Sequence, residues 1–190
     1  MALNLSGAFT ALVTPFRSDG SLDLDALARL VEWQIESGIS GLVPCGSTGE
    51  SATLTPEEHI RVVRHVVEVA SGRVPVVAGT GSNSTREAIE LTAAARSAGA
   101  DGALLISPYY NKPTQEGIYQ HYRMVALEGG LPIVLYNIPG RTASRIESAT
   151  TARLSRVPGV AGLKECGGDF AATAETIQSV APGFAVLSGD

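Results

Sequence analysis

Two residues in this sequence could do covalent chemistry together, because each ends a short apolar segment. Lys164 closes the segment 160–164, and Tyr136 directly follows the segment 133–135. A lysine amine forms a Schiff base with a ketone or keto acid once burial lowers its pKa. The end of a buried strand supplies that burial, whereas a solvated loop does not. Taken alone, Lys164 is more simply interpreted as an ordinary loop lysine. Whether it is catalytic must be judged from the residues around it.

Both segments belong to a regular alternation that runs along the whole chain. Apolar runs of strand length predict strands at 8–14, 41–45, 74–78, 102–107, 132–137, 160–164 and 184–188. Amphipathic segments lie between them, and the residues that signal a helix start are Asp23, Thr55, Ser84 and Thr114. Glycines at or beyond the helix ends are expected in the left-handed conformation, namely Gly38, Gly72, Gly99, Gly129 and Gly159.

This repeated strand–helix unit predicts an α/β fold with parallel strands covered on both faces. A doubly wound sheet is the alternative, but the first turn lacks a GxGxxG motif. Seven successive units favour a (β/α)8 TIM barrel that forms one domain over residues 1–190. The chain stops at Asp190, just after the seventh strand, so we expect a barrel truncated after that strand.

In such a barrel, the loops that follow the strands build the active site. Unusual residues gather in those positions, in the segments 46–51, 79–81, 108–111, 136–142 and 164–165. Because side chains alternate along a strand, Val134 shares a face with Tyr136, and Val160 and Gly162 share a face with Lys164. We therefore expect the amine and the phenol to point into the barrel from neighbouring strands. Each loop residue taken singly could equally be a cap, a turn or a surface residue.

Composition narrows the class of protein. The 190 residues are 44% hydrophobic and 17% charged, with a formal net charge of −5 and no basic run. Nucleic acid and anionic membranes are therefore poor partners, and no apolar stretch is long enough to span a bilayer. Cys45 and Cys166 lack a CxxC spacing and fit a reducing cytoplasm. His59, His65 and His121 lack metal-site spacing, so we interpret them as surface helix residues and expect no metal.

The loop motifs, in order over nearly the whole chain, resemble those of the dihydrodipicolinate synthases. These belong to the pyruvate-dependent class I aldolase family, which also contains N-acetylneuraminate lyase. The resemblance runs from FTALVTPF at 9–16 to LSGD at 187–190 and includes GSTGES, AGTGSN, SPYYNKPTQEG, LYNIPGRT and GLKE. It implies a lyase of lysine and diaminopimelate biosynthesis that condenses pyruvate with L-aspartate 4-semialdehyde to 4-hydroxy-tetrahydrodipicolinate. It implies no cofactor beyond the covalent Schiff base with pyruvate.

The resemblance also assigns roles by position. Lys164 would form the Schiff base, and Tyr136 would transfer protons together with Ser47 and with Tyr110, which comes from a neighbouring subunit. Thr48 would hold the pyruvate carboxylate, and Arg141 would bind the carboxylate of the semialdehyde through its planar fork of donors. A role for Tyr110 across subunits implies a homo-oligomer, which the family builds as a dimer of dimers, and we expect it in the cytoplasm that the two cysteines fit.

Three departures keep alternatives open. Most synthases carry Thr-Thr at the position of Ser47-Thr48, where sialic-acid lyases tend to carry Ser-Thr. The enzymatic alternative is therefore another class I pyruvate aldolase, an N-acetylneuraminate or keto-sugar-acid lyase. Pro56 stands where lysine-inhibited enzymes often have histidine, and this leaves lysine feedback undecided. The other feedback positions match, at Ser51, Ala52, His59, Asn83, Glu87 and Tyr109. The family chain continues beyond the seventh strand, so a truncated, non-catalytic chain is the third reading.

Overall fold

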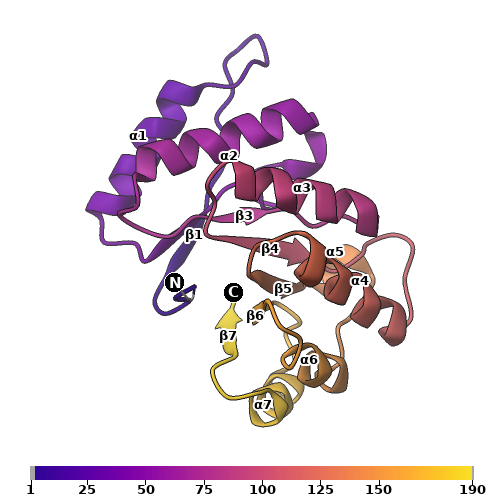
Figure 1. Cartoon of the computed structure of the whole chain (residues 1–190). Coiled ribbons are helices and arrows are strands. Elements are labelled where there is room, and N and C mark those ends of the chain that lie inside the picture. Colours follow the sequence, from indigo (N-terminus) through magenta and orange to yellow (C-terminus); the bar gives the residue numbers. More distant parts are fainter. Residues whose placement is uncertain (1–2, 190) are drawn as a thin grey trace.

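A computed structural model describes residues 3–189 as parallel strands wrapped by helices (Figure 1). Its elements are β1 (Phe9–Ala11), α1 (Leu24–Glu36), β2 (Gly41–Val43), the 3-10 turn η1 (Ser51–Thr53), α2 (Pro56–Ala70), β3 (Val77–Gly79), α3 (Thr85–Ser97), β4 (Gly102–Ile106), α4 (Gln115–Glu128), β5 (Ile133–Asn137), α5 (Pro139–Thr142), α6 (Ser148–Leu154), β6 (Val160–Glu165), α7 (Phe170–Ser179) and β7 (Ala185–Ser188). All seven predicted strands are present, and most are shorter than their apolar runs. The final motif residue, Asp190, lies outside the described residues.

The helices begin where the sequence signals them. Thr55 forms a capping box with Glu58: the Thr55 hydroxyl accepts from the Glu58 amide at 3.2 Å, and the Thr55 amide donates to the Glu58 carboxylate at 2.9 Å. Asp23, Ser84 and Thr114 likewise cap α1, α3 and α4. These contacts satisfy backbone donors that a helix start leaves without partners.

Four of the five predicted left-handed glycines are confirmed, at 38, 72, 99 and 159. The prediction for Gly129 is wrong: its φ is −72°, and the next residue, Gly130, takes the positive φ of 76° instead. The reason is that α4 continues in right-handed geometry through its C-cap before the chain turns.

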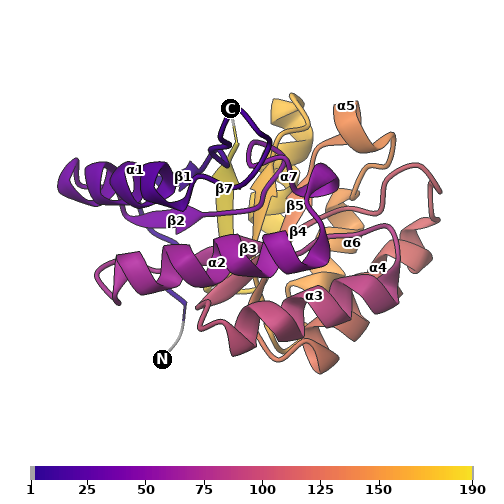
Figure 2. The same cartoon turned by 90° about the horizontal axis from the view of Figure 1, so that it is seen from above.

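The strands form one curved wall in chain order. β1 pairs with β2, β3 to β7 form a five-stranded sheet in sequential order, and all pairs are parallel. A bridge between Leu42 and Val76 joins the two sheets. The helices lie along the outside of this wall, as Figure 2 shows from above. Seven units of the predicted barrel are thus confirmed, and within residues 3–189 no ladder joins β7 to β1.

Two apolar clusters lie on opposite faces of the wall. The inner cluster includes Val43, Val77, Leu104, Val134 and Tyr136, which come from β2 to β5. The outer cluster packs the other strand faces, including Ile133, Leu135 and Leu163, against the helices. Alternation of side chains along each strand produces this division.

One strand residue lies on a different face from the one that alternation predicts. Val160 belongs to the outer cluster, although it was expected to share the inner face with Gly162 and Lys164. The pairing of β5 with β6 shifts at this point: Ile133 pairs with Val160, but the next pair is Val134 with Gly162. Ala161 is the extra residue, and it packs toward the inner cluster. A bulge of this kind reverses the alternation on one side of it.

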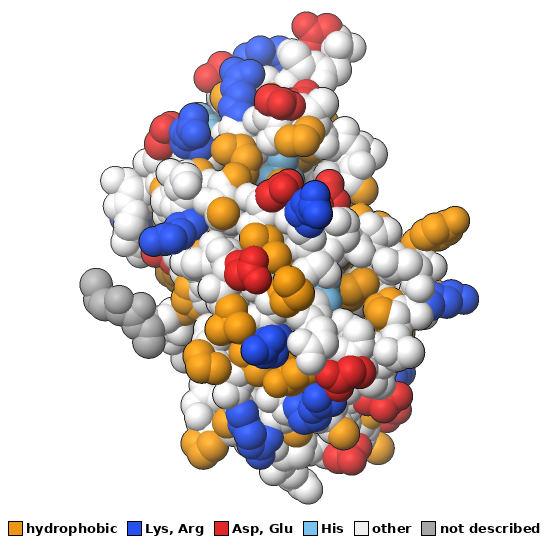
Figure 3. Space-filling view, turned by 45° about the vertical axis from the view of Figure 1, so that its right-hand side comes forward, with side chains coloured by type: hydrophobic (Ala, Val, Ile, Leu, Met, Phe, Trp, Pro, Cys, Tyr) orange, Lys and Arg blue, Asp and Glu red, His pale blue; other side chains and the backbone are white. Residues whose placement is uncertain are grey.

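The surface is mixed in charge. On the face in Figure 3, acidic and basic side chains are interspersed with apolar side chains, several of which lie next to one another, and no basic patch stands out there. Among the helices of residues 3–189, none combines the length and apolar content that crossing a bilayer requires.

Candidate active site

The amine and the phenol singled out in the sequence lie side by side at the carboxyl ends of β5 and β6. Tyr136 and Lys164 are direct cross-strand partners, and the Lys164 Nζ lies 4.4 Å from the centroid of the Tyr136 ring. Lys164 is half-buried and lines a cavity of about 240 Å³ inside the barrel wall, together with apolar residues such as Leu104 and Val134. The expectation that both side chains point inward is confirmed.

Two glycines near this lysine lie where a side chain would meet its neighbours. A β-carbon at Gly162 would approach the Ala185 carbonyl oxygen to 2.8 Å, so glycine lets β6 and β7 lie this close. A β-carbon at Gly189 would lie 2.6 Å from the Lys164 Cε and 2.0 Å from the Cys166 sulfur, so a larger residue there would displace these two side chains.

Tyr136 is a buried phenol with several polar neighbours. Burial raises its pKa to about 12, and the neighbouring Cys166 thiol acts in the same direction. The positive charge of Arg141 and a hydrogen bond with the Ser47 hydroxyl act in the opposite direction. The phenol is therefore protonated near neutral pH, with a serine hydroxyl and a thiol in contact with it. A hydroxyl held in this way can donate a proton and receive one back.

The loop after β2 brings Ser47 to the phenol. The Gly49 and Ser51 amides both donate to the Gly46 carbonyl, at 3.0 and 3.4 Å, and the Thr14 hydroxyl donates to the Gly49 carbonyl at 2.7 Å. A β-carbon at Gly49 would lie 2.9 Å from the Leu12 carbonyl oxygen, which explains the glycine. The loop is thus folded on itself and pinned to the end of β1.

Arg141 reaches the same place from the other side. It lies on the short helix α5, which follows β5 and starts at Pro139, a residue suited to a helix start. The Thr142 hydroxyl donates to the Ser144 carbonyl at 2.8 Å and receives a hydrogen bond from Ser107 at 3.3 Å, which fixes the turn. The exposed arginine then lines a cavity of about 480 Å³ together with Ser47 and Tyr136.

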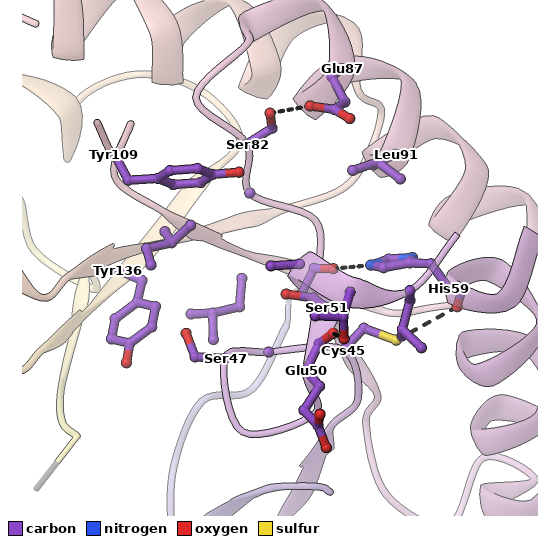
Figure 4. Close-up of a pocket in the computed structure, with 18 of the residues that line it drawn as sticks. Cys45, Ser47, Glu50, Ser51, His59, Ser82, Glu87, Leu91, Tyr109 and Tyr136 are labelled. Atoms are coloured by element: carbon purple, nitrogen blue, oxygen red, sulfur yellow. Dashed lines mark hydrogen bonds between the residues drawn. The ribbon is translucent and has the colours of Figure 1, made fainter. Parts of the chain in front are cut away.

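That larger cavity extends away from Tyr136 toward α2 and α3. Figure 4 shows Ser47 next to Tyr136 at one end, with His59, Glu87 and Tyr109 farther along. Five of the six positions matched to a lysine feedback site line it: Ser51, Ala52, His59, Glu87 and Tyr109. The sixth, Asn83, donates to the Tyr109 carbonyl at 3.2 Å and so lies at its edge.

The interpretation of the histidines as surface residues is wrong for two of them. His59 and His121 are buried, with 4% and 5% of their surface exposed, because each lies on a helix face that packs against a neighbouring element. His59 of α2 contacts the Gly79 carbonyl of β3, and His121 of α4 contacts the Thr85 hydroxyl of α3. The His59 Nε2 lies 2.8 Å from the Gly79 carbonyl and must donate to it, which leaves Nδ1 as an acceptor without a partner. Burial lowers the pKa of both imidazoles, for His121 to about 4. Within residues 3–189, no three metal-ligating side chains gather.

Two predicted site residues are not brought to the phenol within this chain. Thr48 is exposed and lines neither cavity. Tyr110 is 87% exposed, and its backbone is left-handed, with a φ of 72°.

Sequence reasoning missed three residues beside the reacting pair. Asn137 and Glu165 follow Tyr136 and Lys164 directly and bond to each other, and Cys166 contacts the phenol. Asn137 and Glu165 stood within the quoted motifs, but only the strand register shows that they meet.

The chain matches a known protein family over nearly its whole length. The sequence profile described as the Dihydrodipicolinate synthetase family matches residues 4–190. A curated 4-hydroxy-tetrahydrodipicolinate synthase of Nitratidesulfovibrio vulgaris (strain Miyazaki F) is 57% identical over 99% of this chain and 64% of its own length. The corresponding synthase of Pseudomonas aeruginosa PAO1 is 53% identical over 98% of this chain and 64% of its own length.

Solved structures agree with these matches. A dihydrodipicolinate synthase from Bacillus anthracis has a TM-score of 0.97 at 45% identity, over all of this chain and 65% of its own. The synthase from Acinetobacter baumannii, solved in complex with pyruvate, has a TM-score of 0.96 at 49% identity, over 98% of this chain and 64% of its own. This chain therefore spans slightly less than two thirds of the length of these proteins.

Proposed function

The chain belongs to the dihydrodipicolinate synthetase family, and on that premise we propose that its site condenses pyruvate with L-aspartate 4-semialdehyde through a Schiff base on Lys164. One observation carries the proposal: the Lys164 amine lies 4.4 Å from the ring of a protonated, hydrogen-bonded Tyr136, and the phenol shares a cavity with Arg141. A pyruvate complex of a similar solved protein agrees with the first substrate.

The chemistry follows from the groups in place. The Lys164 lone pair attacks C2 of pyruvate, and the resulting carbinolamine loses its hydroxyl as water with a proton from Tyr136. The iminium then accepts electrons when a C3 proton leaves, which gives an enamine. The enamine C3 attacks the aldehyde carbon, and the alkoxide takes up a proton. Attack of the substrate amine on C2 then closes the ring and releases Lys164. Each step needs a nearby group that gives or takes a proton, which Tyr136 with Ser47 supplies.

The second substrate can be tested through Arg141, whose planar guanidinium suits a carboxylate. We expect Arg141→Ala to leave pyruvate imine formation intact and to slow condensation by about ten-fold or more, since hydrogen bonds to charged groups contribute about 1.5–3 kcal/mol. Arg153→Ala is the matched control, because Arg153 forms a surface pair with Glu116 away from the site. Equal loss of both steps would make Arg141 structural.

The enzymatic alternative is a lyase for sialic acid or another keto-sugar acid, and Ser47-Thr48 is the feature that favours it. Arg141 favours a short, carboxylated second substrate. Turnover of pyruvate with the semialdehyde, measured against cleavage of N-acetylneuraminate, separates the two. Cleavage without condensation would overturn the proposed substrate pair.

We further propose that the active form is a cytoplasmic homo-oligomer in which Tyr110 completes the relay of a neighbouring subunit. Its 87% exposure supports a role outside its own chain. Mixing inactive Tyr110→Phe and Lys164→Ala chains should restore activity if subunits exchange. Full activity of a monomeric species would contradict the proposal.

Lysine feedback at the far end of the larger cavity is also a proposal. The gathering of Ser51, His59, Glu87 and Tyr109 supports it, and Pro56 lines the same cavity without offering a polar group. Loss of turnover on addition of L-lysine, relieved by Glu87→Gln, tests it. Turnover unaffected by L-lysine would contradict it.

A further inference from the structure

A compact polar cluster lies directly behind the reacting pair, on the outer side of the wall. Asn137 and Glu165 each follow the residue that carries the chemistry, and they are cross-strand partners just as Tyr136 and Lys164 are. Because side chains alternate along a strand, Asn137 and Glu165 point away from the barrel interior while their neighbours point into it. They therefore take no part in the steps above.

Hydrogen bonds fix the orientation of the Asn137 side-chain amide and the Glu165 carboxylate. The Asn137 Nδ2 donates to both carboxylate oxygens of Glu165, at 3.0 and 2.9 Å. The Asn137 Oδ1 accepts from the Ile146 amide at 3.0 Å, which fixes the side-chain amide one way round. The Glu165 Oε1 also accepts from the Gly167 amide at 2.6 Å. Asn137 is only 1% exposed, so an unsatisfied group there would be costly.

The same pair holds two loops that flank the site. Ile146 lies in the connection 143–147 between α5 and α6, and so the pair anchors the segment that follows the helix carrying Arg141. Gly167 lies in the loop after β6, and a β-carbon there would lie 2.6 Å from the Glu165 Oε1. The Cys166 amide adds a backbone bond of 2.9 Å to the Asn137 carbonyl.

We propose that this Asn137–Glu165 clamp is a positioning device that sets the distance between the Lys164 amine and the Tyr136 phenol, an inference that rests on the function proposed above. The clamp touches neither substrate nor reacting atoms. Its loss should therefore slow imine formation while leaving pyruvate binding unchanged. A displacement of about 1 Å in such a pair can cost on the order of 100-fold in rate.

The chain offers a test by exchange of partners. In Glu165→Gln, the new side-chain amide replaces one of the two oxygens that accept from the Asn137 Nδ2, so two N–H donors face each other. In Asn137→Asp, two carboxylates face each other. The double variant carries both substitutions and so reverses the direction of the hydrogen bond between the two positions. The new amide at position 165 then donates to the new carboxylate at position 137.

Two of the remaining bonds of the clamp survive this exchange, whereas the long bond from the Asn137 Nδ2 to the Ile146 carbonyl, at 3.5 Å, is lost. The carboxylate at position 137 can still accept from the Ile146 amide, and the amide oxygen at position 165 can still accept from the Gly167 amide. The readouts are the rate of borohydride-trappable imine formation at saturating pyruvate, the half-saturating pyruvate concentration and the thermal midpoint.

We expect each single variant to form imine about 10- to 100-fold more slowly with an unchanged half-saturating concentration. The double variant should return to within about three-fold of the unmodified chain, whereas two independent changes would add and slow imine formation further. Glu116→Gln, the same substitution in an exposed ion pair, should change nothing. Where a single variant fails to fold, Glu165→Asp replaces it, since it keeps the charge and shortens the reach.

Three results would overturn the inference. If the folded single variants, or Glu165→Asp, formed the trappable imine at the rate of the unmodified chain, the clamp would be unnecessary. A folded double variant as slow as the single variants would show that the two residues do not act as a pair. Failure of the unmodified chain to trap pyruvate would overturn the proposed function and this inference together, and is thereby distinguished from the other two results.

Discussion

The two sides of the barrel wall are built differently. β5 and β6 are each paired on both edges, and they carry the reacting pair, the clamp behind it and the loops around it. Within residues 3–189, β1 and β7 are each paired on one edge alone. Residues of both strands nevertheless face one cavity of about 240 Å³, including Phe9 and Ala11 from β1 and Leu187 from β7. The reacting residues thus lie at β5 and β6, where the wall is continuous. The unpaired backbone groups and the apolar surface lie at β1 and β7, where the wall is open.

This contrast predicts that changes on the closed side alter rates, whereas changes on the open side alter stability. A folded variant of the closed side that lost stability but kept its rate, or a variant of the open side that lost rate but kept its stability, would break the distinction. The following predictions are ordered by the size of the expected effect.

The largest effect is expected at the phenol. Tyr136→Phe removes the hydroxyl that exchanges protons but keeps the ring in the inner cluster. Because a positioned acid–base group contributes about 100- to 10,000-fold, we expect turnover to fall by that factor. The thermal midpoint should move little, which is the control for folding. A variant that kept nearly all of the original turnover would remove Tyr136 from the relay.

The open side should respond to added chain. We expect a version of this chain extended with the segment of the Nitratidesulfovibrio vulgaris synthase that lies beyond the matched region to be markedly more stable. Unpaired strand edges invite association with other chains, and each large apolar side chain that becomes buried contributes about 1.5–3 kcal/mol. Denaturant unfolding and light scattering of the two versions measure this. If the two versions were equally stable and the shorter chain were monodisperse, the unpaired strand edges would neither lower the free energy of unfolding nor promote association.

A smaller effect is expected from the buried histidine of α4. Burial lowers the pKa of His121 from 6.5 to about 4, so the unfolded chain binds its proton first as the pH falls. The corresponding stability, on the order of 3 kcal/mol, is present above pH 6.5 and is lost as the pH falls toward 4. The depressed pKa of His59 acts in the same sense.

The variant that isolates this effect is His121→Asn, whose side-chain amide can replace the contact of the His121 Nδ1 with the Thr85 hydroxyl at 2.9 Å. The free energy of unfolding of this variant should depend less steeply on pH between 6.5 and 4 than that of the unmodified chain. If urea unfolding gave the same dependence of the free energy of unfolding on pH for both proteins across that range, His121 would not titrate in this way.

The sequence predicted much of the closed side because its signals are local. Alternation within two strands placed Tyr136 and Lys164 on one face, and caps such as Thr55 fixed the helix starts. What it could not predict depends on partners that are distant along the chain. The bulge at Ala161 moved Val160 to the other face, and covering by neighbouring elements buried His59. The clamp required a known register before its two side chains could be matched.

The roles taken from family resemblance divide in the same way: some residues meet within one chain, and others need a second subunit or a bound substrate. Ser47 and Arg141 reach Tyr136 through loops of their own chain, so one chain suffices to bring them together. Tyr110, expected to act across subunits, is exposed in a single chain and stays a prediction. The contacts of Thr48 with a carboxylate likewise depend on a bound substrate and stay a prediction.

The central claim is that Lys164 is the nucleophile, and one measurement tests it most directly. The chain is incubated with pyruvate, reduced with borohydride and mapped by peptide mass spectrometry. Lys112, the only other lysine, is exposed on the loop before α4 and serves as an internal control. We predict a single reduced adduct on Lys164, absent from Lys164→Ala. An adduct on Lys112, or no adduct in a folded chain, would contradict the account.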